Sequence, residues 1–257
     1  MIEDISISVI IPCFNSENTI QDCVNSVLNQ SVSVNELIII DDGSTDNTRT
    51  IIKEILKEMP PEIKAISIEQ QNQGPSAARN NGVKISSSAY IAFLDSDDKW
   101  FPENIRLIKE FITANNSYDV VSTKYQSAPT AFTGEVTFKK LLFKNYFLTP
   151  CVVVKRKTFQ MQNGFDEGMR FSEDYFLWLN IIHKGRGYLL PYTGARNIED
   201  KKPFGQKGLS SNLKEMHLGV LKAFQQLSQS QKISYREYLM VAFFENIKYL
   251  RRLLISH

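Results

Sequence analysis

Runs of consecutive apolar residues alternate with stretches of helical periodicity through the first half of the chain. The apolar runs are short and rich in β-branched residues, which is typical of strands buried in a parallel sheet. They cover residues 5–11, 37–40, 65–68 and 90–94. Pro12 is expected to end the first run. Between the runs, apolar residues recur three and four positions apart, as in Ile20, Cys23, Val24 and Val27. This alternation predicts an α/β fold with a mostly parallel central sheet flanked by helices.

The second half of the chain has a less regular pattern. Residues 152–154 predict a further strand, and residues 173–183 predict an amphipathic helix. Residues 194–208 are polar and contain three glycines, which favours a mobile loop. From Asn212 onward the pattern predicts two helices.

Composition narrows the class of protein. The chain has 257 residues, of which 42% are hydrophobic and 23% charged, so it can bury a large core and is neither disordered nor collagen-like. The formal net charge of +2 is too small to indicate nucleic-acid binding.

The cysteines and histidines show no pattern of a disulfide framework or a zinc site. Cys13, Cys23 and Cys151 are scattered along the chain, and the histidines lack the spacing of zinc ligands. No secretory signal precedes the first strand, and no apolar run reaches the ~18 residues of a membrane span. We therefore expect a cytoplasmic protein.

Polar clusters follow the predicted strands. They are residues 15–17, 41–42, 72–80 and 95–98. In parallel sheets ligands bind at the carboxyl ends of the strands, so these clusters are expected to share one edge. The sequence FLDSDD at 93–98 places Asp95, Asp97 and Asp98 directly after a strand, and Mg²⁺ or Mn²⁺ prefers such carboxylates together with a substrate's phosphates. The alternative is a polar turn in which Asp98 caps the next helix.

Five segments, in order, resemble the motif series of family 2 glycosyltransferases. They read VIIPCFN (9–15), IIIDDGSTDNT (38–48), NQGPSAARNNG (72–82), FLDSDD (93–98) and SEDYFLWL (172–179). The resemblance implies a GT-A fold that transfers a sugar with inversion at the anomeric carbon. It further implies one domain over residues 1–210, with a nucleotide-binding half at about 1–98 and an acceptor-binding half at 99–210. Residues 211–257 would form a C-terminal helical extension.

The resemblance assigns the nucleotide to the loops after the first two strands. Asp42 would accept the N3–H of uracil or thymine, although an Asx turn before Gly43 explains the same residue. Pro12, Phe14 and Asn15 would flank the base, with burial in the core as the alternative for Phe14. Glu17 and Ser96 complete this substrate-binding group.

The remaining donor contacts come from the third and fourth motifs. Arg79 would steady the diphosphate or an aspartate near the ribose. Asp95 would contact the ribose or the sugar, and Asp97 would bind Mn²⁺ or Mg²⁺, which neutralises the departing diphosphate. Lys207 and Ser210 fall where many relatives place a loop that closes over the diphosphate, although a solvated lysine cluster is the alternative.

The general base is expected at the start of the helix at 173–183. Inverting transfer needs a group that takes the proton of the acceptor hydroxyl, and Asp174 occupies the family's position for it. Glu173 competes for that role, and both acids could instead stabilise the helix dipole.

These roles together predict a UDP-sugar donor. The QxxRW signature of processive synthases is absent, which favours transfer of a single sugar. The acceptor would be a hydroxyl of a growing glycan or lipid-linked oligosaccharide, as in bacterial enzymes of O-antigen, capsule or lipooligosaccharide synthesis. The rivals are a sugar-phosphate nucleotidyltransferase and a non-catalytic nucleotide- or glycan-binding module.

The predicted C-terminal helices carry an apolar stripe beside basic residues. The stripe comprises Leu239, Phe243, Ile247, Leu250 and Leu254. Such a helix favours either peripheral contact with the inner face of the cytoplasmic membrane or packing on the catalytic domain or a homodimer partner.

Overall fold

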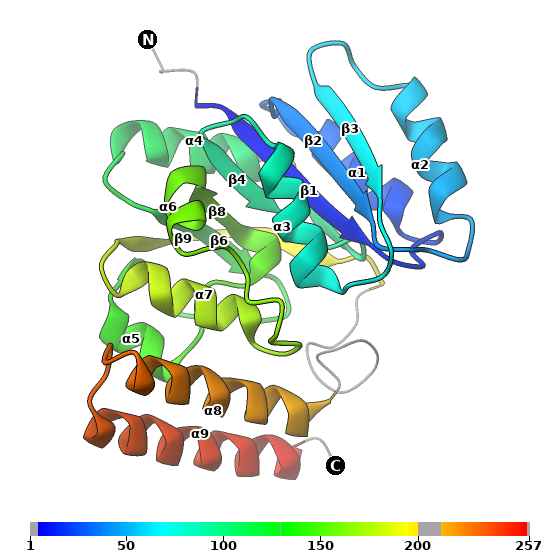
Figure 1. The fold of residues 1–257 in the computed structure, drawn as a ribbon. Helices are drawn as coiled ribbons and strands as arrows, with labels where there is room; N and C mark the ends of the chain where they lie inside the picture. The colour runs from blue at the N-terminus through cyan, green and yellow to red at the C-terminus, as the bar shows by residue number, and fades with distance from the viewer. Residues whose placement is uncertain (1–4, 129, 200–211, 256–257) are drawn as a thin grey trace.

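The computed structural model describes residues 5–128, 130–199 and 212–255. Within these ranges one mixed, nine-stranded sheet lies between two layers of helices (Figure 1). The strands are β1 (Ile7–Cys13), β2 (Glu36–Asp41), β3 (Lys64–Glu69), β4 (Tyr90–Phe93), β5 (Asp98–Trp100), β6 (Val120–Tyr125), β7 (Gly134–Val136), β8 (Val152–Lys155) and β9 (Gly187–Asn197). Their order is β3-β2-β1-β4-β8-β6-β9-β5, with β7 paired to β9.

Helices cover both faces of this sheet and bury two hydrophobic clusters. The helices are α1 (Ile20–Leu28), α2 (Thr48–Lys57), α3 (Pro75–Ile85), α4 (Asn104–Ala114), α5 (Phe138–Phe143), α6 (Arg156–Met161), α7 (Glu173–Ile182), α8 (Leu213–Gln229), α9 (Tyr235–Ile255) and the 3₁₀ turn η1 (Thr149–Cys151). Apolar residues of α1, α2 and α4 join one cluster, and those of α3, α5, α6, α7, α8 and α9 join the other. Alternate residues of β1 serve the two sides: Ile7, Val9 and Ile11 face the first cluster, and Ile10 the second.

The first half has the predicted architecture. Strands β3, β2, β1 and β4 are all parallel neighbours, so their carboxyl ends meet at one edge of the sheet. The expected end of β1 at Pro12 is wrong, because β1 continues to Cys13. The carbonyl of Ile10 accepts a hydrogen bond from the N–H of Leu94, just after the end of β4. Pro12 lies two residues further along β1, so its nitrogen faces the same side of the strand, at a point beyond the end of β4. Pro12 has no N–H to donate, but at this point no hydrogen bond between the two strands is lost.

The second half is mixed rather than parallel. Strand β8 is antiparallel to both β4 and β6, whereas β6 and β9 are parallel. The predicted strand at 152–154 and the predicted helix at 173–183 are confirmed as β8 and α7. The loop predicted at 194–208 is wrong over its first four residues, which belong to β9. Within β9, position 194 requires a glycine because a side chain there would collide with Thr123 and Asn104, so Gly194 marks close packing rather than a turn.

The C-terminal helices extend the layer that contains α7 (Figure 1). Helix α8 buries Val220, Ala223, Phe224 and Leu227, and its apolar residues share a hydrophobic cluster with those of α7. Helix α9 is the outermost element, next to α8. None of the described helices is both long and apolar enough to cross a membrane.

Candidate active site

The acidic turn after β4 holds its three carboxylates in different environments. Asp97 is exposed, Asp95 is half-buried, and Asp98 is buried as the first residue of β5. Helix α4 begins only at Asn104, so the alternative in which Asp98 caps a helix is wrong. Asp98 accepts a hydrogen bond from the Tyr125 hydroxyl at 2.6 Å, and burial, with the charges of Asp95 and Asp97, raises the pKa of Asp98 to about 8. The three carboxyl groups therefore lie close enough at the carboxyl edge of the sheet for the charges of Asp95 and Asp97 to help hold the proton on Asp98.

Arg79 joins this turn to the start of α7. It projects from α3, and its Nη2 atom lies 2.6 Å from Asp95 Oδ1 while its Nη1 atom lies 3.3 Å from Glu173 Oε1. The Arg79 side chain is only 7% exposed, so both ion pairs are largely shielded from water. Of the two predicted roles for Arg79, this geometry fits the steadying of an aspartate.

The start of α7 holds two acids side by side. Burial raises the pKa of Glu173 to about 7, the charge of Asp174 adds to the shift, and Arg79 opposes it. Burial also raises the pKa of Asp174, although hydrogen bonds from the Tyr175 N–H and the Thr149 hydroxyl oppose that shift. Asp174 is half-buried and takes no part in the ion pair between Arg79 and Glu173, so it is the more accessible of the two acids.

Ser172 connects the start of α7 to α8. It directly precedes α7, has a φ of 60°, and donates a hydrogen bond from its hydroxyl to the carbonyl of Met216 in α8.

Asp42 organises the loop that leads into α3. Its carboxylate accepts the backbone N–H groups of Gln73 at 2.9 Å and Gly74 at 2.8 Å, and the side chain of Gln70 at 2.7 Å. Gly43 follows with a φ of 81°, and a side chain there would lie 2.9 Å from the nitrogen of Asn72, so the turn needs glycine. The Asp42 carboxylate thus has a structural task in addition to the predicted contact with the base. A carboxylate has about four acceptor positions, so the three bonds leave room for a ligand.

The loops after β1 and β2 are fastened to each other. Asn15 has a φ of 50° and its Oδ1 accepts the Thr45 N–H at 2.9 Å. Glu17 accepts the Asn47 N–H at 2.9 Å, so it braces the same pair of loops. A further contact of 2.8 Å, between the hydroxyls of Ser16 and Ser96, ties them to the acidic turn.

Pro12 and Phe14 differ in exposure at the end of β1. Pro12 is buried in the strand, whereas Phe14 is 49% exposed. The alternative of a core position for Phe14 is therefore wrong, and its ring is available to a base. Lys207 and Ser210 lie outside the described residues, as does the predicted loop from residue 200 onward.

The structure also places residues at the site that the sequence did not indicate. Asn197 of β9 donates to the Asp97 carbonyl and to the carboxylates of Asp97 and Asp98. Thr149 reaches Asp174 from η1, and Tyr125 reaches Asp98 from the end of β6. Tyr125 carried a usable signal, because it ends the sequence VVSTKY of β6, whose β-branched residues are typical of a strand.

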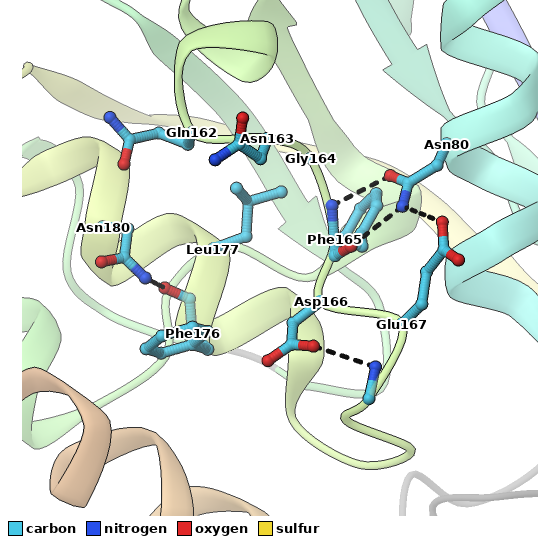
Figure 2. Close-up of a pocket in the computed structure, with 11 residues that line it drawn as sticks. Asn80, Gln162, Asn163, Gly164, Phe165, Asp166, Glu167, Phe176, Leu177 and Asn180 are labelled. Carbon is cyan, nitrogen blue, oxygen red and sulfur yellow. Dashed lines mark hydrogen bonds between the residues drawn. The ribbon is translucent and has the colours of Figure 1, made fainter.

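A separate cavity of about 430 Å³ lies between the loop at 162–168 and α7 (Figure 2). Asn80 of α3 holds this loop through the N–H and the carbonyl of Phe165. None of the predicted donor-site residues lines this cavity.

The acidic turn offers suitable ligands for a hard cation. Among the described residues, no three acidic, imidazole or thiol side chains converge as a ready-made metal site. Mg²⁺, however, is commonly held by one or two carboxylates together with water and the phosphates of a substrate. The exposed Asp97, in a turn whose charge already raises the pKa of Asp98, fits that arrangement. The metal-binding role of Asp97 stays a prediction.

Comparison with known proteins identifies the family. The model of glycosyl transferase family 2 matches residues 8–178, which include the acidic turn, Arg79 and the start of α7. The chain belongs to glycosyltransferase family 2. It is thus an enzyme of that class rather than a nucleotidyltransferase or a non-catalytic module.

Two curated relatives cover the chain to different extents. The E. coli UDP-Glc:alpha-D-GlcNAc-diphosphoundecaprenol beta-1,3-glucosyltransferase WfgD is 33% identical over 216 residues, 82% of this chain and 81% of WfgD. An uncharacterized glycosyltransferase of Rickettsia bellii is 36% identical over 191 residues, 70% of this chain. The match spans 27% of the length of the Rickettsia protein.

A solved structure shares the fold. S. aureus TarS 1–349 in complex with UDP-GlcNAc superposes with a TM-score of 0.72 at 20% identity, over 92% of this chain and 70% of the TarS 1–349 chain. Together with the family match, this similarity confirms the GT-A fold: a mixed central sheet flanked by helices, with a C-terminal helical region.

Proposed function

We propose that this glycosyltransferase moves one sugar from a UDP-sugar to a hydroxyl of a growing bacterial surface glycan, with inversion and with Mn²⁺ or Mg²⁺. The name of WfgD supports a UDP-sugar donor and an acceptor on a lipid diphosphate, and the TarS complex supports a UDP-linked sugar. We place the reaction in the cytoplasm, at the membrane face where a lipid-linked acceptor is reached. The three buried cysteines, none in a disulfide, support a reducing compartment.

One observation carries the proposal: the Arg79 guanidinium contacts both Asp95 and Glu173. A single side chain therefore brings the acidic turn of β4 to the start of α7. Transfer requires this proximity, because the leaving diphosphate and the proton acceptor act on opposite sides of one anomeric carbon.

We assign each residue a role that is compatible with its position. Asp42 and Phe14 would hold the base, and Asp95 the ribose or sugar. Asp97 would hold the metal ion, whose charge offsets that of the departing UDP. Asp174 would take the proton of the acceptor hydroxyl as its oxygen attacks the anomeric carbon, and the bonding electrons would leave with the diphosphate. Glu173, already paired with Arg79, would position that guanidinium.

Asp174→Asn tests the assignment of the base. A thermal-shift screen of UDP-sugars with Mn²⁺ first selects the donor. We expect transfer to a GlcNAc-diphosphoryl lipid to fall by about 10²- to 10⁴-fold in Asp174→Asn, the usual cost of losing a general base, with unchanged affinity for UDP. Glu173→Gln is the comparison variant. Near wild-type transfer by Asp174→Asn, with a larger loss in Glu173→Gln, would move the role to Glu173.

A further inference from the structure

The outer face of α9 is apolar and uncovered by the described chain. We call Leu239, Phe243, Ile247, Leu250 and Leu254 the outer stripe. Their exposed fractions run from 46% for Ile247 to 81% for Leu254. Spacings of three and four residues align them along one side of the helix, and Met240 and Phe244, both more than 40% exposed, widen the stripe. Figure 1 shows α9 at the edge of the molecule, beside α8. A contiguous exposed apolar surface of this kind marks an interaction site.

The rotation of α9 about its axis is fixed by its inner face. Val241 and Glu245 are each only 1% exposed. The Glu245 carboxylate pairs with Lys248 and, at 2.8 Å, with Arg252. Between α8 and α9, His217 stacks on Tyr249 with ring centroids 4.3 Å apart. Turning the outer stripe inward would expose Val241 and break the contacts of Glu245, so the stripe must face outward.

The charges beside the outer stripe are basic. Arg236 and Arg251 lie on the exposed side of α9, and Lys144 is exposed at the end of the neighbouring α5. Of the two acids of α9, Glu245 is buried and Glu237 caps the helix start through Ser234. An anionic surface is therefore complementary to this face.

We propose that the outer stripe docks on an anionic phospholipid bilayer, with its apolar side chains among the acyl chains and Arg236 and Arg251 at the headgroups. A second copy of the chain is a poorer occupant, because a two-fold contact would place each basic rim against its own copy. Such docking would hold the enzyme at a membrane, where the lipid-linked acceptor of the proposed function would lie.

Vesicle co-sedimentation of the whole chain tests the proposal. The vesicles are phosphatidylcholine alone or phosphatidylcholine with phosphatidylglycerol, and no nucleotide is added. We expect binding to the anionic vesicles that weakens with added salt, and a loss of about tenfold or more in partitioning for Phe243→Asp/Ile247→Asp. Met161→Asp is the matched control, since Met161 is 68% exposed on α6, away from α9. It should bind as the wild type does.

Three outcomes would overturn the proposal. They are equal recovery in the supernatant with both vesicle types, binding that the double variant leaves unchanged, and a dimer in solution that the double variant dissociates. UDP binding by each variant, measured in parallel, keeps the test separate from the proposed function, because a failure of the membrane contact leaves that affinity intact.

Discussion

Arg79 is the residue at which the acidic groups of the site meet. Its guanidinium contacts Asp95 and Glu173 while almost completely buried, and it lies 5.4 Å from the ring centroid of Phe165. An arginine is suited to this position because its planar fork offers separate N–H groups to two carboxylates. Without it, two carboxylates in a shielded place would face each other with no cation between them.

Arg79→Ala should therefore destabilise the protein strongly. Removing one partner of a buried ion pair leaves the other charges uncompensated, so we expect a loss of about 3 kcal/mol or more in urea unfolding. Arg106→Ala is the matched control, because Arg106 pairs with Glu103 and Glu110 at the surface of α4. Exposed pairs contribute about 0–1 kcal/mol, so equal losses in the two variants would contradict the structural role of Arg79.

Glu173 makes stability depend on pH. Its pKa is raised from 4.5 to about 7, so between these values the folded chain binds a proton that the unfolded chain has released. Stability should thus fall as pH rises through this window, and it should be level above it. Glu173→Gln cannot release this proton.

We expect the free energy of unfolding of wild type, relative to Glu173→Gln, to fall by about 2 kcal/mol between pH 5 and pH 8. Urea unfolding at the two pH values measures the difference. Glu110→Gln, which alters an exposed glutamate, should show no such change relative to wild type. A difference that rises with pH would mean that Glu173 is ionised and stabilised in the fold.

At the scale of elements, α8 and α9 differ in whether their phenylalanines are buried or exposed. Phe224 of α8 is fully buried in the cluster that also contains Trp178 of α7, whereas Phe243 of α9 is 63% exposed. Helix α8 is thus part of the catalytic core in packing terms, and the outer side of α9 is not.

Phe224→Ala should cost about 3–5 kcal/mol, and Phe243→Ala should cost well under 1 kcal/mol. Urea unfolding followed by tryptophan fluorescence and circular dichroism measures both. Because α8 shares its core with α7, the two probes should give one coincident transition. Separate transitions would show that the C-terminal helices fold independently of the sheet.

Elements were predictable where periodicity and sequence neighbours determine them. Strands β1 to β4 are parallel, and an apolar run in the sequence predicted each of them, although the edge strand β3 has no buried residue. Pro12 and Gly194 misled the prediction because each owes its place to a distant neighbour: Pro12 to the early end of β4, and Gly194 to Thr123 and Asn104. Such close approaches follow from the tertiary fold and leave no local pattern.

On the scale of the whole molecule, the sheet gathers the predicted site from loops far apart in sequence. The order of the motifs and the parallel arrangement were sufficient to predict that Asn15, Asp42 and Asp95 share one edge. The partners supplied by the second half were not predictable, because Asn197 and Thr149 reach the acids from a mixed arrangement that the sequence pattern did not reveal. The contributions of Lys207 and Ser210 stay predictions.

The most direct test of the central claim is the metal dependence of UDP binding, measured by isothermal titration calorimetry with Mn²⁺ and with EDTA. We predict affinity that falls by about tenfold or more when the metal is removed or when Asp97 is changed to alanine, because Asp97 would hold the ion that offsets the charge of the diphosphate. Asp22→Ala, which removes an exposed acid of α1, is the control and should bind UDP as the wild type does. Equal affinity with Mn²⁺ and with EDTA, or full metal-dependent affinity in Asp97→Ala, would contradict the account.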